Sequence, residues 1–159
     1  AENRIFSASP PMQKDNVIRS IILGFLLAMP LYVQAQESPP APKVIVNASV
    51  KVQQLSHAQL RSIYMMRQVL WPDGSAIKVF VLPNRSELHL QFCRQQLQLF
   101  PYQLDRVWQK LTYSGTGTPP TEVADSAKMR ELVASTPGAI GYIETGNDIS
   151  ELQIVQIQP

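Results

Sequence analysis

The sequence is poor in cysteine and histidine, and this excludes several kinds of stabilising or reactive site. Cys93 is the only cysteine in 159 residues, so the chain cannot form an internal disulfide and depends on a hydrophobic core. We expect Cys93 to be a small buried hydrophobe on a helix rather than a reactive thiol. The two histidines, His57 and His89, lie in separate segments without acidic or cysteine clusters at metal-ligand spacing. We therefore expect no metal site.

Charge is also scarce. Charged residues make up 16% of the chain and the formal net charge is +2. Because no long basic run is present, the sequence gives no indication of a nucleic-acid partner. Hydrophobic residues make up 45%, which is typical of a globular chain and not of a disordered one. The length suits one domain with a core of its own.

Familiar enzyme signatures are missing as well. No serine stands in a G-x-S-x-G elbow, and no H-E-x-x-H motif occurs. Glu144 and Asp148 form the one carboxylate pair near the end of an expected strand, and a solvated loop explains them better than an acid/base pair does. We predict a protein that is not an enzyme, with no catalytic residue and no cofactor.

One apolar run, Ile21–Met29, lies near the N-terminus. Lys14 and Arg19 precede it, and Ala35 supplies a small residue for cleavage. The alternative, a membrane anchor, would need about 20 apolar residues. The order of these features predicts a signal peptide at 12–35, cleaved on export to the periplasm, which leaves no membrane span. Residues 1–11 precede a plausible start methionine and are interpreted as upstream or added residues.

A proline-rich linker at 36–43 is expected to lead into an α/β domain at 44–159. β-branched and alternating runs predict strands at 44–50, 76–83, 121–126, 139–144 and 152–158. Helical spacing predicts helices at 55–66, 86–100, 101–111 and 127–135. Strands that alternate with helices indicate a mixed, mostly parallel sheet flanked by helices.

Capping residues mark the expected helix starts. Ser56 and Gln59 have the spacing of a capping box. Ser86 and Ser126 are the expected N-caps of two later helices, and Pro101 suits the first position of another.

Two stretches could hold an anion. The first, SGTG at 114–117, is small and rich in hydroxyls, but Pro119 and Pro120 carry the chain onward in extended form, so no helix start points at it. The second, LPNRSE at 82–87, runs from a strand end into a helix cap, where first-turn N–H groups and Arg85 could bind an oxyanion. An ordinary N-cap beside a solvated arginine is the alternative.

Several motifs resemble a known family. WPDG at 71–74, SGTGTPP at 114–120 and above all PGAIGY at 137–142 are similar to a group of short exported proteins related to the substrate-binding protein of the ABC phosphate transporter. The likeness extends from Val44 to Ile157. It implies a single lobe of the type 2 periplasmic-binding-protein fold.

The resemblance also implies a ligand position. In the full transporter protein, phosphate lies at an Arg-x-Ser-Gly-Thr segment that caps a helix and is followed by Phe. This chain matches it with Arg85 and Ser86, but Glu87 replaces the Gly and Leu88 replaces the Thr. The carboxylate repels an anion that seeks the same N–H groups, and the lost hydroxyl removes a donor. The candidate ligand residues are Asn84, Arg85 and Ser86, helped by Ser114, Gly115 and Thr116.

Two functions remain open at this point. The first is an exported solute-binding-like protein that binds inorganic phosphate or a related oxyanion weakly, because one lobe cannot enclose it. The alternative is a non-enzymatic envelope interaction module on the same fold that has lost ligand binding and docks on a protein partner or forms a homodimer. For such a module, Trp71 is either an exposed anchor or a lid over the sheet edge, whereas Trp108 is expected to pack in the core. Gly138 and Gly141 are expected to be structural.

Overall fold

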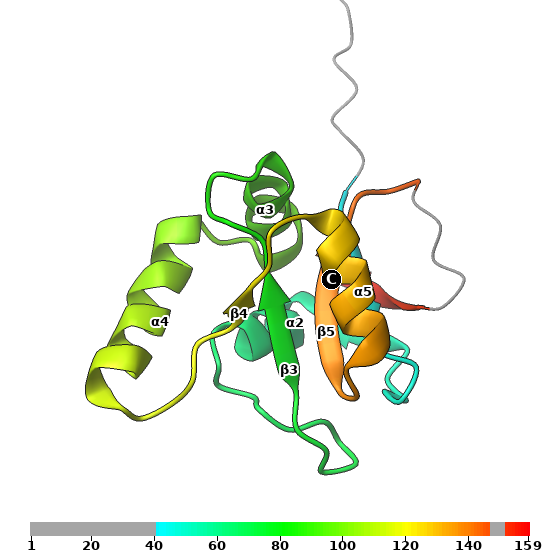
Figure 1. The fold of residues 1–159 in the computed structure, drawn as a ribbon, viewed down its shortest axis with the longest axis horizontal. Coiled ribbons are helices and arrows are strands. Elements are labelled where there is room, and N and C mark those ends of the chain that lie inside the picture. Colours follow the sequence, from blue (N-terminus) through cyan, green and yellow to red (C-terminus); the bar gives the residue numbers. More distant parts are fainter. Residues whose placement is uncertain (1–40, 147–151) are drawn as a thin grey trace, which may run out of the picture. The chain divides into compact units, whose positions relative to one another are not determined.

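The computed structural model describes residues 41–146 and 152–159, which form a six-stranded sheet with helices around it (Figure 1). Its strands are β1 (Lys43–Val46), β2 (Gln54–Ser56), β3 (Lys78–Val81), β4 (Thr121–Glu122), β5 (Ala139–Ile143) and β6 (Gln153–Gln158). They lie in the order β2-β6-β1-β5-β3-β4. β1 is antiparallel to both of its neighbours, and the other neighbouring pairs are parallel. The predicted mixed, mostly parallel sheet is confirmed.

Four helices flank the sheet in the described part of the chain: α2 (His57–Tyr64), α3 (Glu87–Phe92), α4 (Pro101–Ser114) and α5 (Ser126–Ser135). The helix expected at 86–100 is shorter, because a π-helical segment, η1 (Cys93–Leu97), follows α3 directly. Gln98 then adopts a left-handed conformation with φ 55°, which ends this segment. The capping box of Ser56 and Gln59 is present, and Pro101 is the first residue of α4, as predicted.

Successive side chains of β5 point to opposite faces of the sheet, and helices pack on both faces. Gly141 faces α5, since a Cβ at this position would lie 2.5 Å from Met129 Sδ and 3.0 Å from Val133 Cγ2. In Figure 1, α5 lies across β5. Tyr142 points the other way, and its ring stacks on Phe92 of α3 with the centroids 3.8 Å apart. The close packing predicted for Gly141 is confirmed.

Both tryptophans join segments that are distant in the sequence. Trp71 is only 3% exposed, and its Nε1–H donates to the carbonyl of Gly138 over 2.9 Å. This burial excludes Trp71 as an exposed anchor. Trp108 is half-buried on α4, and its Nε1–H donates to the carbonyl of Tyr64 over 2.8 Å. It packs against the core from its margin and is less buried than predicted.

Asn47 connects the end of β1 to the end of α5. Its Nδ2 donates to the carbonyls of Val133 and Ala134 over 2.8 and 2.7 Å, and its Oδ1 accepts the N–H of Ser49 over 2.9 Å. The last carbonyls of a helix have no partner within the helix. One buried amide therefore satisfies two of them and fixes α5 on the sheet.

Two predictions fall outside the described residues, namely the signal peptide at 12–35 and the position of Asp148. Across residues 41–146 and 152–159, no helix combines the length and apolar character that a bilayer crossing requires.

Candidate functional site

The loop between β3 and α3 lies at the carboxyl end of a parallel strand, where open α/β sheets usually bind ligands. It begins with Leu82, whose buried backbone N–H donates to the Tyr142 hydroxyl over 2.8 Å. A turn follows, in which the N–H of Ser86 donates to the carbonyl of Pro83 over 2.8 Å. These two bonds hold the loop that carries the candidates Asn84, Arg85 and Ser86.

Arg85 is the free cation of this loop. Its side chain is exposed, and no hydrogen bond or ion pair to it occurs among the described residues. A guanidinium presents several donors in a fixed plane and can bind two oxygens of an oxyanion at once. Arg85 is therefore available to a ligand without losing an existing contact.

Asn84, by contrast, is already occupied. Its Nδ2 donates to both carboxylate oxygens of Asp105 on α4, over 2.9 and 2.8 Å. An anion would have to displace this carboxylate and would meet its charge at close range. Asp105 is a residue that the sequence analysis missed, and nothing in the spacing of α4 indicates that it would reach this loop.

Ser86 occupies the N-cap position of α3, as predicted, with φ −69° and ψ 127°. Its hydroxyl makes no capping hydrogen bond, so no side-chain oxygen caps the first turn of α3. Glu87 directs its carboxylate along the helix, where Gln91 Nε2 lies 3.4 Å and Arg94 Nη2 lies 3.8 Å away. The pair with Arg94 is solvent-exposed and contributes little to stability. It does, however, place a cation beside the Glu87 carboxylate.

The structure places Ser114, Gly115 and Thr116 in different surroundings. Ser114 is the last residue of α4, and Gly115 is its C-cap with φ 65°. The Ser114 hydroxyl donates to the carbonyl of Lys110 over 2.7 Å and lies 2.7 Å from Thr116 Oγ1. A helix C-terminus presents carbonyl oxygens and the negative end of the dipole, which do not favour an anion.

The two groups of candidates are also separated along α4. Asp105 contacts Asn84, and Ser114 lies nine residues further, about 13 Å along the axis at 1.5 Å per residue. Figure 1 shows α4 starting near α3 and ending away from it. No hydrogen bond or ion pair joins the two groups within the described residues. The structure thus does not bring residues 84–86 and 114–116 together.

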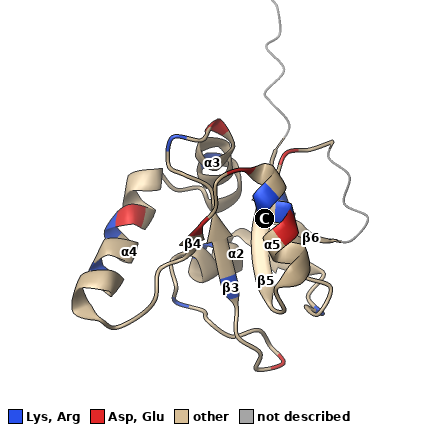
Figure 2. Ribbon diagram, in the orientation of Figure 1, with Lys and Arg blue, Asp and Glu red and all other residues tan. Residues whose placement is uncertain are grey.

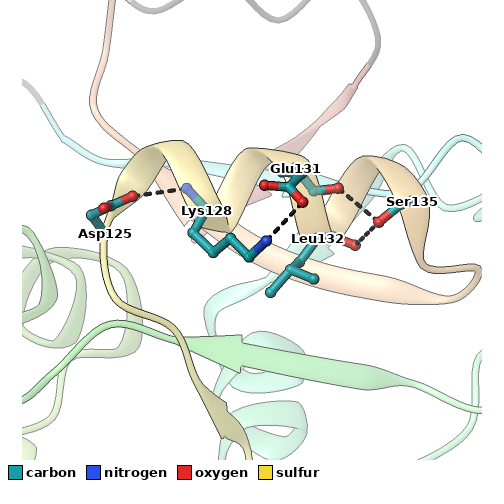
Figure 3. A network of polar contacts seen from close by, with 5 residues as sticks. All are labelled: Asp125, Lys128, Glu131, Leu132 and Ser135. Atoms are coloured by element: carbon teal, nitrogen blue, oxygen red, sulfur yellow. Dashed lines mark hydrogen bonds and ion pairs between the residues drawn. The ribbon is translucent and has the colours of Figure 1, made fainter.

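α5 follows β4, the parallel neighbour of β3, and its N-terminus carries acidic residues. Asp125, and not the predicted Ser126, is its N-cap, with Oδ1 accepting the N–H of Lys128 over 2.8 Å (Figure 3). The Ser126 hydroxyl lies 3.4 Å from Glu144 Oε1. Figure 3 also shows the ion pair of Lys128 with Glu131, 2.7 Å long, on the next turn. Carboxylates therefore occupy the positive end of this helix.

A chain of hydrogen bonds between buried side chains reaches the β3–α3 loop at Leu82. The Tyr142 hydroxyl accepts the Leu82 N–H and lies 2.6 Å from His89 Nδ1, and His89 Nε2 lies 3.4 Å from Cys93 Sγ. The simplest proton arrangement has Tyr142 donating to Nδ1 and a neutral His89 donating from Nε2 to the sulfur. Sequence reasoning considered His89 for a metal site, Cys93 as a buried hydrophobe and Tyr142 as part of a structural motif, and it missed the hydrogen bonds that join them.

Burial sets the protonation of this chain. Burial lowers the pKa of His89, and this effect outweighs that of the Asp105 carboxylate, which raises the pKa. Burial also raises the pKa of Cys93 to about 12 and raises the pKa of Tyr142. Because the thiolate is the nucleophile, the buried Cys93 is inert, as the sequence predicted. No group of three or more metal-ligating side chains occurs in the described part of the chain.

Charge is spread over the domain without a dominant sign. Figure 2 shows both basic and acidic residues on α4 and on α5, where blue and red segments lie next to one another. The β3–α3 loop thus has one free arginine among several carboxylates and no broad positive field around it.

Comparisons with known proteins identify the fold. No family model matches the chain, and no curated protein matches it. Among solved structures, an ABC-type phosphate transport receptor from Vibrio cholerae superimposes with a TM-score of 0.53 at 18% identity, over 74% of this chain and 46% of that one. A phosphate ABC transporter substrate-binding protein with bound phosphate from Clostridium perfringens gives 0.58 at 16% identity, over 74% and 44%. PstS from Borrelia burgdorferi gives 0.54 at 17%, over 74% and 47%.

These similarities establish the fold and its extent. The chain shares its α/β architecture with phosphate-transport receptors, and the match spans less than half the length of each receptor chain. This agrees with the single lobe that the sequence predicted.

Proposed function

We propose that this chain is an exported, solute-binding-like domain that binds inorganic phosphate or a related oxyanion weakly at the β3–α3 loop. The observation that carries the proposal is the free, exposed Arg85 at the carboxyl end of β3, in a fold shared with phosphate receptors. The first turn of α3, which no side chain caps, adds N–H donors beside it. Export to the periplasm through the signal peptide at 12–35 is part of this proposal.

Weak binding follows from the neighbours of Arg85. The Asn84 amide is held by Asp105, and Glu87 stands in the first turn. A ligand at this exposed loop also keeps part of its hydration, and water screens its contacts. We therefore expect a dissociation constant in the millimolar range for inorganic phosphate.

Calorimetric titration of the purified protein with phosphate and with sulfate tests the proposal. Arg85→Ala is expected to weaken phosphate binding about tenfold or more, since a hydrogen bond to a charged group contributes about 1.5–3 kcal/mol. Arg67→Ala is the matched control, because Arg67 is an exposed arginine after α2, outside the loop. No heat at millimolar phosphate, or equal losses in the two variants, would contradict the proposal.

The second candidate is a non-enzymatic envelope interaction module on the same fold. The carboxylates of Asp105 and Glu87 around the loop favour it, because they oppose an anion where the fold would hold one. Its partner is an envelope protein or a second copy of the chain. Measuring the mass of the protein in solution with and without phosphate separates the two. A dimer whose mass and stability do not change with phosphate favours the module. A monomer that binds phosphate favours the first proposal.

The proposal includes no enzymatic activity. The similar solved structures are named as transport receptors and binding proteins. Glu144, one of the two carboxylates considered for acid/base work, is exposed and lies 3.4 Å from the hydroxyl of Ser126.

A further inference from the structure

A pocket that the proposed oxyanion site does not use lies along α4. It has a volume of about 280 Å³ and opens to solvent. Its lining residues all belong to this helix: Asp105, Trp108, Gln109, Thr112 and Tyr113. At about 3.6 residues per turn, the two aromatic residues stand about 140° apart around the helix axis, and the other three fall between them. The pocket is therefore a strip of polar residues between two aromatic rings, and its size suits a small molecule.

Asp105 supplies a negative charge that no protein cation compensates. Both of its oxygens accept from Asn84 Nδ2, over 2.9 and 2.8 Å, but a carboxylate has about four lone-pair sites and the amide is neutral. Asp105 forms no ion pair among the described residues. None of the described lysines and arginines lines the pocket, and the neighbouring Arg106 lies over the ring of Tyr102, 5.7 Å from its centroid. The charge of the pocket is therefore negative.

The two aromatic rings add a second attraction for a cation. The ring of Trp108 is held in place, because its Nε1–H donates to the carbonyl of Tyr64 over 2.8 Å. Tyr113 is 88% exposed, so its ring can contact a ligand without losing a core contact. The faces of aromatic rings attract ammonium groups, and tryptophan attracts them most strongly.

The end of α4 adds a third attraction. Thr112 and Tyr113 lie in the last turn of the helix, which ends at Ser114 and contains no basic residue. The C-terminal end of a helix carries a partial negative charge that favours cations. The carboxylate, the rings and the helix end thus all favour a positive ligand, whereas Arg85 favours a negative one.

We propose that this pocket binds small organic cations, in particular quaternary ammonium compounds such as choline. The ammonium group lies beside the Asp105 carboxylate and contacts the rings of Trp108 and Tyr113. Most of the surface that lines the pocket is apolar, which suits the methyl groups of a quaternary ammonium better than the N–H groups of a primary amine. The site does not use Arg85, and it does not depend on the oxyanion binding proposed above.

Three ligands test the role of charge and of the methyl groups. They are choline, its neutral isostere with a tert-butyl group in place of the trimethylammonium group, and ethanolamine. Each is titrated into the isotopically labelled full chain, and the Trp108 indole N–H and the amides of Thr112 and Tyr113 are followed by NMR. Choline is expected to saturate these shifts at millimolar concentrations, and the other two ligands are expected to bind several-fold more weakly.

The outcomes of this titration separate the parts of the proposal. Equal affinity for choline and its neutral isostere would overturn the role of charge. Tighter binding of ethanolamine than of choline would overturn the preference for a quaternary ammonium. No saturable shift with choline would overturn the site.

Matched variants test the lining groups. Asp105→Asn removes the charge but keeps an oxygen for Asn84, and it is expected to weaken choline binding about two- to fivefold, as for an exposed charge pair. Its control is Glu122→Gln, which removes an exposed carboxylate outside the pocket. Tyr113→Leu should also weaken choline binding about two- to fivefold, the effect of one exposed cation–π contact. Its control is Tyr102→Leu, because Tyr102 is an exposed tyrosine of α4 outside the pocket. Equal losses in a variant and its control would overturn the assignment to this pocket, and Tyr113→Leu should leave phosphate binding unchanged, so the two sites can fail separately.

The same ammonium group occurs in free choline and in the headgroup of phosphatidylcholine. The free cation is favoured, because the Asp105 carboxylate repels the phosphate that lies next to the ammonium in the lipid. Sedimentation with phosphatidylcholine vesicles tests this choice, and the wild-type protein is expected to stay in the supernatant. Sedimentation with the vesicles that is lost in Tyr113→Leu would overturn the assignment to a free cation.

Discussion

Gly138 joins three segments of the chain through its own backbone. Its N–H donates to the Ser49 hydroxyl over 3.0 Å, and its carbonyl accepts the Trp71 indole N–H over 2.9 Å and the Lys78 backbone N–H over 3.1 Å. It adopts φ +76°, and a Cβ at this position would overlap the carbonyl oxygen of Ala76. Both the left-handed conformation and the lack of space therefore require glycine.

A pair of glycine substitutions separates these two requirements. Gly115 also has a left-handed φ, +65°, but nothing lies within 4 Å of the position a Cβ would take. Gly115→Ala is expected to lower the free energy of unfolding by about 1–2 kcal/mol, the cost of the left-handed conformation. Gly138→Ala should cost about 3 kcal/mol or more, because overpacking adds about 1–3 kcal/mol. Urea denaturation measures both, and similar losses would show that the overlap with Ala76 is relieved at little cost.

At the residue scale, local rules predicted what depends on near neighbours in the sequence. The capping box of Ser56, the inert Cys93 and the glycines of the PGAIGY motif are as expected. The contact between Asn84 and Asp105 was not predictable, because it depends on how α4 packs beside the loop. For the same reason, residues 114–116 and 84–86 were predicted from the sequence to bind one ligand, although the two groups lie apart in the folded chain.

Among the elements, α5 shows how a cap can be misread by one residue. The sequence DSAKMRE places Asp125 and Ser126 side by side, and both residue types are good N-caps. The structure selects Asp125, whose carboxylate also complements the positive end of the helix dipole. Ser126 is the first helical residue.

Substitution of the two residues distinguishes them. Asp125→Ala is expected to lower the free energy of unfolding by about 1 kcal/mol, which is typical for a lost N-cap. Ser126→Ala should change it by less than about 0.5 kcal/mol, as for most surface substitutions. Thermal or urea unfolding of both variants measures these changes. A larger loss of stability in Ser126→Ala than in Asp125→Ala would identify Ser126 as the N-cap.

The elements that the sequence missed are the least regular ones. β2 has three residues, two of them polar, and its run is too short for alternation to be recognised. η1 continues α3 with a different hydrogen-bond pattern but the same kind of residues, so hydrophobic spacing cannot separate the two. Longer strands and helices, where the pattern repeats several times, are close to the predicted ranges.

On the scale of the whole molecule, the buried polar chain links stability to pH. The pKa of His89 is lower in the folded state than its ordinary value of about 6.5. As pH falls below that value, the unfolded chain takes up a proton at His89 before the folded chain does, so the folded state loses stability. The other titratable groups around His89 are Tyr142 of β5, Cys93 of η1 and Asp105 of α4.

His89→Gln tests this linkage. The wild-type free energy of unfolding is expected to fall between about pH 6.5 and pH 5, by up to about 1.4 kcal/mol per pH unit for a single group. In the variant the slope over this range should be smaller, whatever its stability at neutral pH. Urea unfolding at a series of pH values gives the slopes, and equal slopes would show that other groups dominate.

The position of β1 affects how the domain can fold. β1 is the first strand of the domain, yet it lies inside the sheet between β5 and β6, the last two strands. The nearby bond from Thr145 to Ala41 closes a separation of 104 residues. Such non-local pairing slows folding, because loop closure must precede the contacts that compensate for it. β1 has no neighbour to pair with until β5 and β6, the last two strands in the sequence, are available. The core can therefore be completed only after these C-terminal strands have joined the sheet.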